Sequence, residues 1–108
     1  MPRVLITGIT GFAGSHLAQR LVAAGATVHG FAHEDPPYAN LAAIADEVAM
    51  HRGDIRSVDA VRTAIRDAEP DVVAHLAGLA VPTEAARDPT AAVRVNVLGT
   101  AAVIAALE

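Results

Sequence analysis

The sequence contains no cysteine and no lysine, and its only tyrosine is Tyr38. Without cysteine the chain can form no disulfide and offers no thiolate as nucleophile or metal ligand, which fits a reducing cytosol. All eight basic residues are arginine. A reaction that depends on a lysine therefore cannot be carried out by this chain alone.

Charge and apolar length exclude further classes. The net charge is −4, and 53% of the 108 residues are hydrophobic. Because no basic patch occurs in the sequence, we expect no nucleic-acid partner. No apolar run approaches the roughly 18 residues of a membrane span, so we expect no membrane partner. Residues 1–3 lead directly into the first expected strand, which leaves no room for a signal peptide and favours a cytoplasmic protein.

Residues 4–16 are the most informative stretch. Three apolar residues, Val4 to Ile6, predict a buried strand, and a helical pattern follows that runs to Gly25. Between them lie three glycines at the spacing GxxGxxG: Gly8, Gly11 and Gly14. Such glycines permit the turn, let a pyrophosphate approach the main chain and let helix and strand pack closely. The helix N-terminus adds unpaired N–H groups, so we favour nucleotide binding over a tight turn without a ligand.

Further strands are expected at residues 27–31, 48–51 and 71–76, with helices between and after them. This alternation predicts an α/β fold of the Rossmann type, with three layers and parallel strands in the order 3-2-1-4. We expect residues 1–108 to be the N-terminal part of one such NAD(P)-binding domain. The fourth strand would then be an apolar open edge.

The last helix is expected to begin at Asp88, because aspartate caps helices and Pro89 suits the first helical position. Val93, Val97, Ala101 and Ile104 share one stripe, which we expect to face the core. Asn96 falls on the same stripe, where a buried amide without partners would cost about 1–3 kcal/mol.

Four motifs occur in order: TGITGFAGSHL from Thr7, Gly53-Asp54-Ile55, His75-Leu-Ala-Gly78 and Asn96-Val-Leu-Gly-Thr100. Together they resemble the extended short-chain dehydrogenase/reductase family, in particular its nucleotide-sugar epimerases, dehydratases and 4-keto-sugar reductases. The opening motif and Val28-His29-Gly30 are most similar to GDP-mannose 4,6-dehydratases and the related GDP-4-keto-6-deoxymannose reductases.

The resemblance implies roles for particular residues. The glycine loop would line the cofactor pyrophosphate, Asp54 and Ile55 would meet the adenine, and the segment from Leu76 would pass under the ribose and nicotinamide. Asn96 would help to position the active site. The implied cofactor-binding residues are Gly8, Gly11, Phe12, Ala13, Gly14, His33, Asp54, Ile55, Leu76, Ala77, Gly78 and Asn96.

The choice between NAD and NADP depends on the end of the second strand. Ala32 stands there and His33 follows. Glu34 and Asp35 have about the spacing of a ribose-binding acid, but we expect them to be displaced into the loop. His33 could contact a 2′-phosphate, as basic residues do in similar dehydratases, or it could be an exposed loop residue. We therefore expect NAD or NADP, with a slight preference for NADP.

In the family that the chain resembles, a Tyr-x-x-x-Lys pair transfers protons while hydride passes between the nicotinamide and C4 of a nucleotide sugar. Tyr38 is followed four residues later by Ala42, so that pair is absent. We expect the chain alone to be inactive, the complete protein to modify a nucleotide sugar as a homodimer, and the helix from Asp88 to belong to the dimer interface. The histidines have no metal-binding spacing. Two alternatives remain: a non-catalytic NAD(P)-binding regulatory module, and an NAD(P) reductase of non-sugar substrates.

Overall fold

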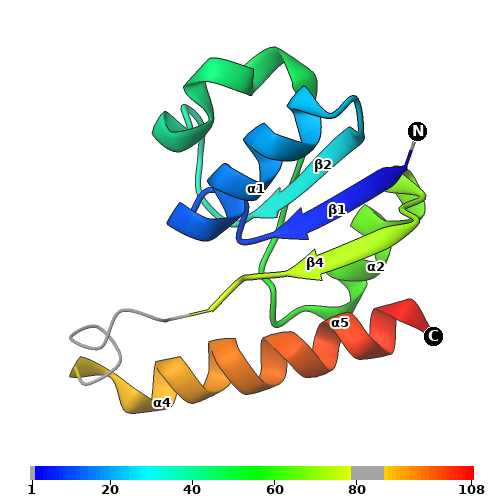
Figure 1. The fold of residues 1–108 in the computed structure, drawn as a ribbon. Helices are drawn as coiled ribbons and strands as arrows, with labels where there is room; N and C mark the ends of the chain where they lie inside the picture. The colour runs from blue at the N-terminus through cyan, green and yellow to red at the C-terminus, as the bar shows by residue number, and fades with distance from the viewer. Residues whose placement is uncertain (1, 79–86) are drawn as a thin grey trace.

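A computed structural model describes residues 2–78 and 87–108. Its centre is a sheet of four strands: β1 (Arg3–Thr7), β2 (Thr27–Ala32), β3 (Val48–Arg52) and β4 (Val72–His75). They lie in the order β3-β2-β1-β4, and every pair is parallel (Figure 1). The expected topology is therefore confirmed. Central β1 aligns its Leu5 with His29 on one side and Val73 on the other.

Helices cover both faces of the sheet, as expected for a three-layer fold (Figure 1). Because successive side chains of a strand point to opposite faces, β1 contributes to two cores. Val4 and Ile6 pack with α1 (Phe12–Ala23) and the 3-10 helix η1 (Ala39–Glu47). Leu5 packs with α2 (Val58–Ala68) and α5 (Gly99–Leu107). Side chains of β1 are held in both cores, and this packing fixes the position of the loop that follows β1.

The expected end of α1 at Gly25 is confirmed by its hydrogen bonds. After α1, Gly25 has φ +88°, its N–H donates to the Val22 carbonyl, and the Ala26 N–H donates to the Leu21 carbonyl. This is the Schellman arrangement that a glycine favours. Ser57 caps α2 by accepting from the Ala60 N–H at 3.2 Å.

The C-terminal helical segment begins with α4 (Pro89–Val93), capped by Asp88, and continues through a π-helical turn, η2 (Arg94–Leu98), into α5. The expected inward stripe is wrong: Val93, Val97 and Ile104 are each 58–59% exposed. The residues that face the core are instead small ones and one valine, namely Ala92, Gly99, Ala102, Val103 and Ala106. The π turn shifts the phase of the helix, and close packing selects small side chains: a Cβ on Gly99 would lie 3.1 Å from the Ile55 side chain.

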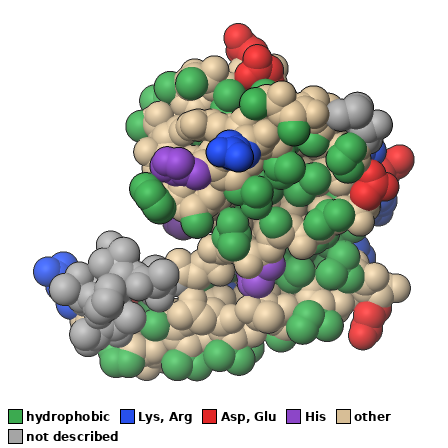
Figure 2. All heavy atoms as spheres, in the orientation of Figure 1, with side chains coloured by type: hydrophobic (Ala, Val, Ile, Leu, Met, Phe, Trp, Pro, Cys, Tyr) green, Lys and Arg blue, Asp and Glu red, His purple; other side chains and the backbone are tan. Residues whose placement is uncertain are grey.

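Two apolar surfaces remain exposed. One is the outer face of the C-terminal helix, where hydrophobic side chains gather (Figure 2). The other belongs to β4, which pairs only with β1 among the described strands and exposes Val72 by 54%. The open edge expected from the sequence is thus present. The continuous helix Pro89–Leu107 is also long and apolar enough, by length and composition, to cross a membrane, with a mean hydropathy of 1.7. We expected no run of that length. A single helix of this kind is weak evidence for a membrane span, and here α5 packs against α2 although only 22% of the apolar window is buried.

Candidate functional site: a pocket at the carboxyl ends of the strands

A pocket of about 490 Å³ lies at the carboxyl ends of the strands. Ligands of open α/β sheets bind in this position, where the strand order reverses. The pocket is walled by the loops that follow all four strands and by the start of the C-terminal helix. The lining residues are Gly8, Thr10, Gly11, Phe31, Ala32, His33, Glu34, Gly53, Asp54, Ile55, Arg56, Leu76, Ala77, Gly78, Ala91 and Val95.

The glycines of the first loop have separate functions. Gly8 has φ +71°, and a Cβ there would lie 2.7 Å from the backbone of Leu76 and Ala77. A Cβ on Gly14 would lie 2.2 Å from the Gly8 carbonyl oxygen, so Gly14 lets α1 pack against the loop. A Cβ on Gly11 would approach only the Gly8 oxygen, at 3.4 Å. Gly11 is therefore the glycine that leaves room for a ligand.

Helix α1 presents a free N-terminus beside this space. Its N-cap is Gly11, which provides no side-chain hydrogen bond, and its first turn contains no acidic residue. The first N–H groups of an α-helix have no partner within the helix and carry partial positive charge. Phe12, Ala13 and Gly14 therefore offer main-chain donors to an anion. The Phe12 side chain itself does not line the pocket, since it is 80% exposed with its ring 4.5 Å from that of His16.

The end of β2 is tied to the glycine loop through Glu34. The Thr10 hydroxyl donates to the Glu34 carboxylate, and His33 Nδ1 lies 3.0 Å from the same side chain. Glu34 lies in the loop after β2, as expected, and from that loop it lines the pocket. Asp35, in contrast, forms an ion pair with Arg52. His33 is in the pocket wall as predicted, with its side chain 80% exposed.

Asp54 lies in the pocket wall as predicted, and its carboxylate already has a partner. Arg56 donates to it from its backbone N–H at 2.9 Å and from its guanidinium at 2.6 to 3.1 Å. These bonds lower the pKa of Asp54 to about 2, so the carboxylate is ionised at neutral pH. An adenine amino group would have to share this acceptor with Arg56. Ile55 is buried and joins the pocket to the core below it.

The segment after β4 forms the opposite wall. Leu76, Ala77 and Gly78 line the pocket, and a Cβ on Gly78 would lie 2.7 Å from Asn96 Oδ1. Asn96 is exposed, in contrast to the expected buried position, and it supports the Gly78 wall from outside.

The structure brings eight of the predicted cofactor residues together in the pocket. They are Gly8, Gly11, His33, Asp54, Ile55, Leu76, Ala77 and Gly78. Phe12, Ala13, Gly14 and Asn96 adjoin the pocket without lining it. Sequence reasoning did not find Phe31, Arg56, Ala91 or Val95 as site residues. The two helix residues have small or ordinary apolar side chains, which give no signal in a sequence. Within residues 2–78 and 87–108, no group of three or more His, Asp or Glu side chains is placed to hold a metal ion.

The sequence and the fold of this chain are similar to those of known nucleotide-sugar enzymes. CDP-glucose 4,6-dehydratase of Salmonella typhimurium is 36% identical over 101 residues, covering 91% of this chain and 28% of that protein. GDP-6-deoxy-D-mannose reductase of Pseudomonas aeruginosa is 34% identical over 106 residues, covering 98% of this chain and 29% of that protein. The crystal structure of Thermus thermophilus UDP-glucose 4-epimerase in complex with NAD matches 96% of this chain and 33% of that one, with 32% identity and a TM-score of 0.85.

The chain thus spans about a third or less of the length of these relatives. The sequence model of the family described as GDP-mannose 4,6 dehydratase matches residues 5–108, which is nearly the whole chain. The chain belongs to this family, in the nucleotide-sugar epimerase and dehydratase group of the extended short-chain dehydrogenases/reductases.

Proposed function

We propose that this chain is the NAD(P)-binding part of an enzyme that modifies a nucleotide sugar by hydride transfer at the sugar C4. The observation that carries the proposal is the meeting of the free α1 N-terminus with the open side of Gly11 in a pocket of about 490 Å³. That combination suits the pyrophosphate of a dinucleotide. Support comes from the NAD complex of the Thermus epimerase, which has the same fold.

The chain's own residues fit such a cofactor. The main-chain donors of the first α1 turn would hold the pyrophosphate, and Glu34 would face a ribose. The small residues Ala77 and Gly78 leave the wall beside β4 flat enough for a planar ring. The bound cofactor would supply the hydride chemistry.

We further propose NAD rather than NADP. The sequence suggested a slight preference for NADP from His33. In the pocket, however, Glu34 is a carboxylate held by Thr10 and His33. A carboxylate at this place accepts from a ribose 2′-OH and repels a 2′-phosphate. His33 is paired with that same carboxylate, so its contribution to phosphate binding is reduced.

The first test is calorimetric titration with NAD and NADP. Gly11→Val should abolish binding, because its side chain would fill the ligand space while the backbone φ remains ordinary. Ala23→Val, at the exposed other end of α1, is the matched control and should bind as the wild type does. A folded wild-type protein that binds neither dinucleotide would overturn the proposal. Tighter binding of NADP would overturn only the cofactor preference.

The second test addresses the reaction. The two curated relatives are named for CDP-glucose and GDP-6-deoxy-D-mannose, so CDP-, GDP- and UDP-hexoses are the substrates to assay. We propose that residues 1–108 alone do not turn these over, because the chain has no lysine and no Tyr-x-x-x-Lys pair. Turnover by the 108-residue chain would contradict this assignment.

We also propose that the complete protein is a homodimer that uses the C-terminal helix. The exposed apolar side chains Val93, Val97 and Ile104 support this, since they need a cover. Val97→Asp should then lower the mass measured by light scattering toward that of a monomer. An unchanged mass would exclude this helix face from the interface.

A further inference from the structure

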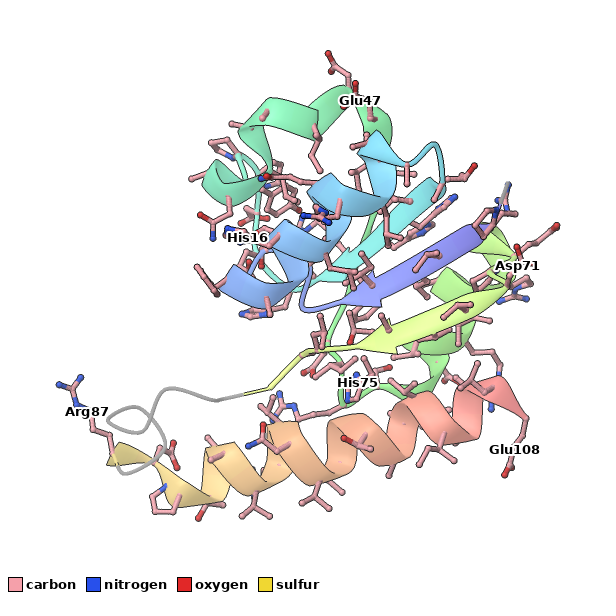
Figure 3. The ribbon with its side chains drawn as sticks, in the orientation of Figure 1. His16, Glu47, Asp71, His75, Arg87 and Glu108 are labelled. Atoms are coloured by element: carbon pink, nitrogen blue, oxygen red, sulfur yellow. The ribbon has the colours of Figure 1, made fainter. Side chains whose placement is uncertain are left out.

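The imidazole of His75 has no part in the proposed cofactor contacts, yet its two ring nitrogens are both engaged. His75 ends β4 and lies between that strand and the C-terminal helix (Figure 3). Nδ1 is 2.7 Å from Thr7 Oγ1, and Nε2 is 3.1 Å from Thr100 Oγ1. The ring thus joins the end of β1 to α5 across residues that are far apart in the chain.

The bonding of Thr7 decides the protonation of the ring. Thr7 is fully buried, and its Oγ1 accepts from the Ala77 N–H at 3.2 Å and from the Leu76 N–H at 3.0 Å. The Leu76 N–H is shared with the Thr7 carbonyl at 3.1 Å. A hydroxyl has two acceptor positions and one hydrogen, so the remaining hydrogen of Thr7 points to His75 Nδ1. Nδ1 must therefore be the unprotonated nitrogen.

The proton of the neutral ring then resides on Nε2, which donates to Thr100 Oγ1. Thr100 in turn donates to the Asn96 carbonyl oxygen at 2.7 Å. The hydrogen bonds therefore run in one direction: Thr7 donates to His75, His75 donates to Thr100, and Thr100 donates to the Asn96 carbonyl oxygen. Burial lowers the pKa of His75, which agrees with a neutral ring. The polar side chains that contact the ring, Thr7 from β1 and Thr100 from α5, are both uncharged.

The chain of bonds ends at an unusual part of the helix. Asn96 belongs to the π-helical turn η2, and such turns inside α-helices often occur at functional sites. Its side chain lies against Gly78, where a Cβ would come within 2.7 Å of Asn96 Oδ1 and displace that side chain. The bonds from Thr7 through His75 therefore connect the strand that carries the glycine loop to the residue that supports the opposite wall of the pocket.

We propose that His75 is a positioning residue: as the neutral Nε2–H tautomer, it holds Thr100 and the η2 turn so that Asn96 stays against Gly78. This role concerns the same pocket and, in its effect on cofactor binding, rests on the proposed function. A residue that only filled space at the end of β4 could adopt either tautomer. The proposed role, in contrast, requires the Nε2–H tautomer and a fixed donor and acceptor in each hydrogen bond from Thr7 to Asn96.

The test uses the full chain labelled with ¹⁵N-histidine and ¹⁵N-asparagine. NMR should show the Nε2–H tautomer at His75 and a distinct environment for the Asn96 side-chain amide. Thr100→Val keeps the shape and removes the hydroxyl; it should shift the Asn96 amide and weaken NAD binding about fivefold, the equivalent of one hydrogen bond. Thr100→Ser should restore both.

A matched control exists on α2. Thr63 also donates its hydroxyl to the carbonyl four residues earlier, Asp59, at 2.9 Å, and its side chain is exposed. Thr63→Val removes the same kind of bond away from His75 and should change neither the Asn96 amide nor NAD affinity. At His75, Gln can reach Thr100 and Asn cannot, so His75→Gln should retain more affinity than His75→Asn.

The outcomes separate the two proposals. An Nδ1–H tautomer, or a Thr100→Val variant with unchanged Asn96 signals, would overturn the role of His75. If the tautomer and the Asn96 shifts are as expected but the wild type binds no dinucleotide, the proposed function fails and the structural role of His75 stands.

Discussion

A methyl group on Gly14 would lie 2.2 Å from the carbonyl oxygen of Gly8. The two glycines are the outer members of the GxxGxxG motif, and they contact each other through the backbone. The Gly8 carbonyl cannot move away from such a methyl group without strain, because Gly8 is itself held at φ +71° against the backbone of Leu76 and Ala77. Packing therefore requires glycine at the first and last positions of the motif, Gly8 and Gly14, whereas the middle glycine, Gly11, borders open space.

Gly14→Ala should therefore destabilise the protein by about 1–3 kcal/mol, the range of overpacked cores. Urea denaturation followed by circular dichroism would measure the loss. Gly11→Ala is the comparison, because its Cβ would make only an ordinary contact; it should lower the urea midpoint less, by the loss of a favourable N-cap residue alone. Equal stability of the two variants would show that α1 can shift away from the loop.

Glu34→Gln should weaken NAD binding roughly tenfold or more, because a hydrogen bond to a charged group is worth about 1.5–3 kcal/mol. NADP binding should fall less or improve, since the repulsion of a 2′-phosphate is removed. Calorimetry with both dinucleotides measures the ratio. Asp35→Asn, the neighbouring acid that pairs with Arg52 outside the pocket, should leave the ratio unchanged.

The Asp54–Arg56 pair should contribute to stability at neutral pH, and this contribution should be lost in acid. The folded pKa of Asp54 is about 2, below its value of about 3.9 in an unfolded chain. Its contribution is therefore fully present above about pH 4 and is lost as the pH falls toward 2. The effect should be small, because both side chains are nearly half exposed. Asp54→Asn should flatten this part of the stability curve in acid titrations monitored by circular dichroism.

Two histidines should make stability depend on pH near neutrality. Burial lowers the pKa of His75, and burial together with the charges of His51 and Arg3 lowers that of His29. The unfolded chain then binds more protons than the folded one below about pH 6.5, so stability is full above that pH and falls as the pH drops. Urea midpoints between pH 7.5 and 5 should show this slope. His29→Gln should reduce it.

The sequence predicted the sheet because its strands are short apolar runs separated by strong signals. Gly25, Ser57 and Asp88 mark helix ends through local chemistry that does not depend on the rest of the fold. The glycine motif after β1 predicted the position of the pocket. The family resemblance predicted that Asp54 and the segment from Leu76 belong to it. These features are all encoded within a few neighbouring residues.

The C-terminal helix could not be predicted in the same way. A regular 3.6-residue period placed Val93 and Val97 toward the core, but the π turn rotates the faces and Ile55 requires small neighbours such as Gly99. The contact of Glu34 with the pocket could not be predicted for a related reason. Its position depends on Thr10, which lies in a different loop, and a single sequence does not show that the two meet.

The central position of β1 has a consequence for the order of folding. β1 precedes β2 and β4 in the chain and pairs with both, and its Arg3 N–H donates to the Asp71 carboxylate 68 residues later. Pairing over such a distance is slow, because a long loop must close before any contact forms. Leu5, which packs against α2 and α5 in the finished domain, would remain accessible on a growing chain until both helices have left the ribosome. β1 therefore obtains its second neighbouring strand, β4, only after most of the described chain has been made.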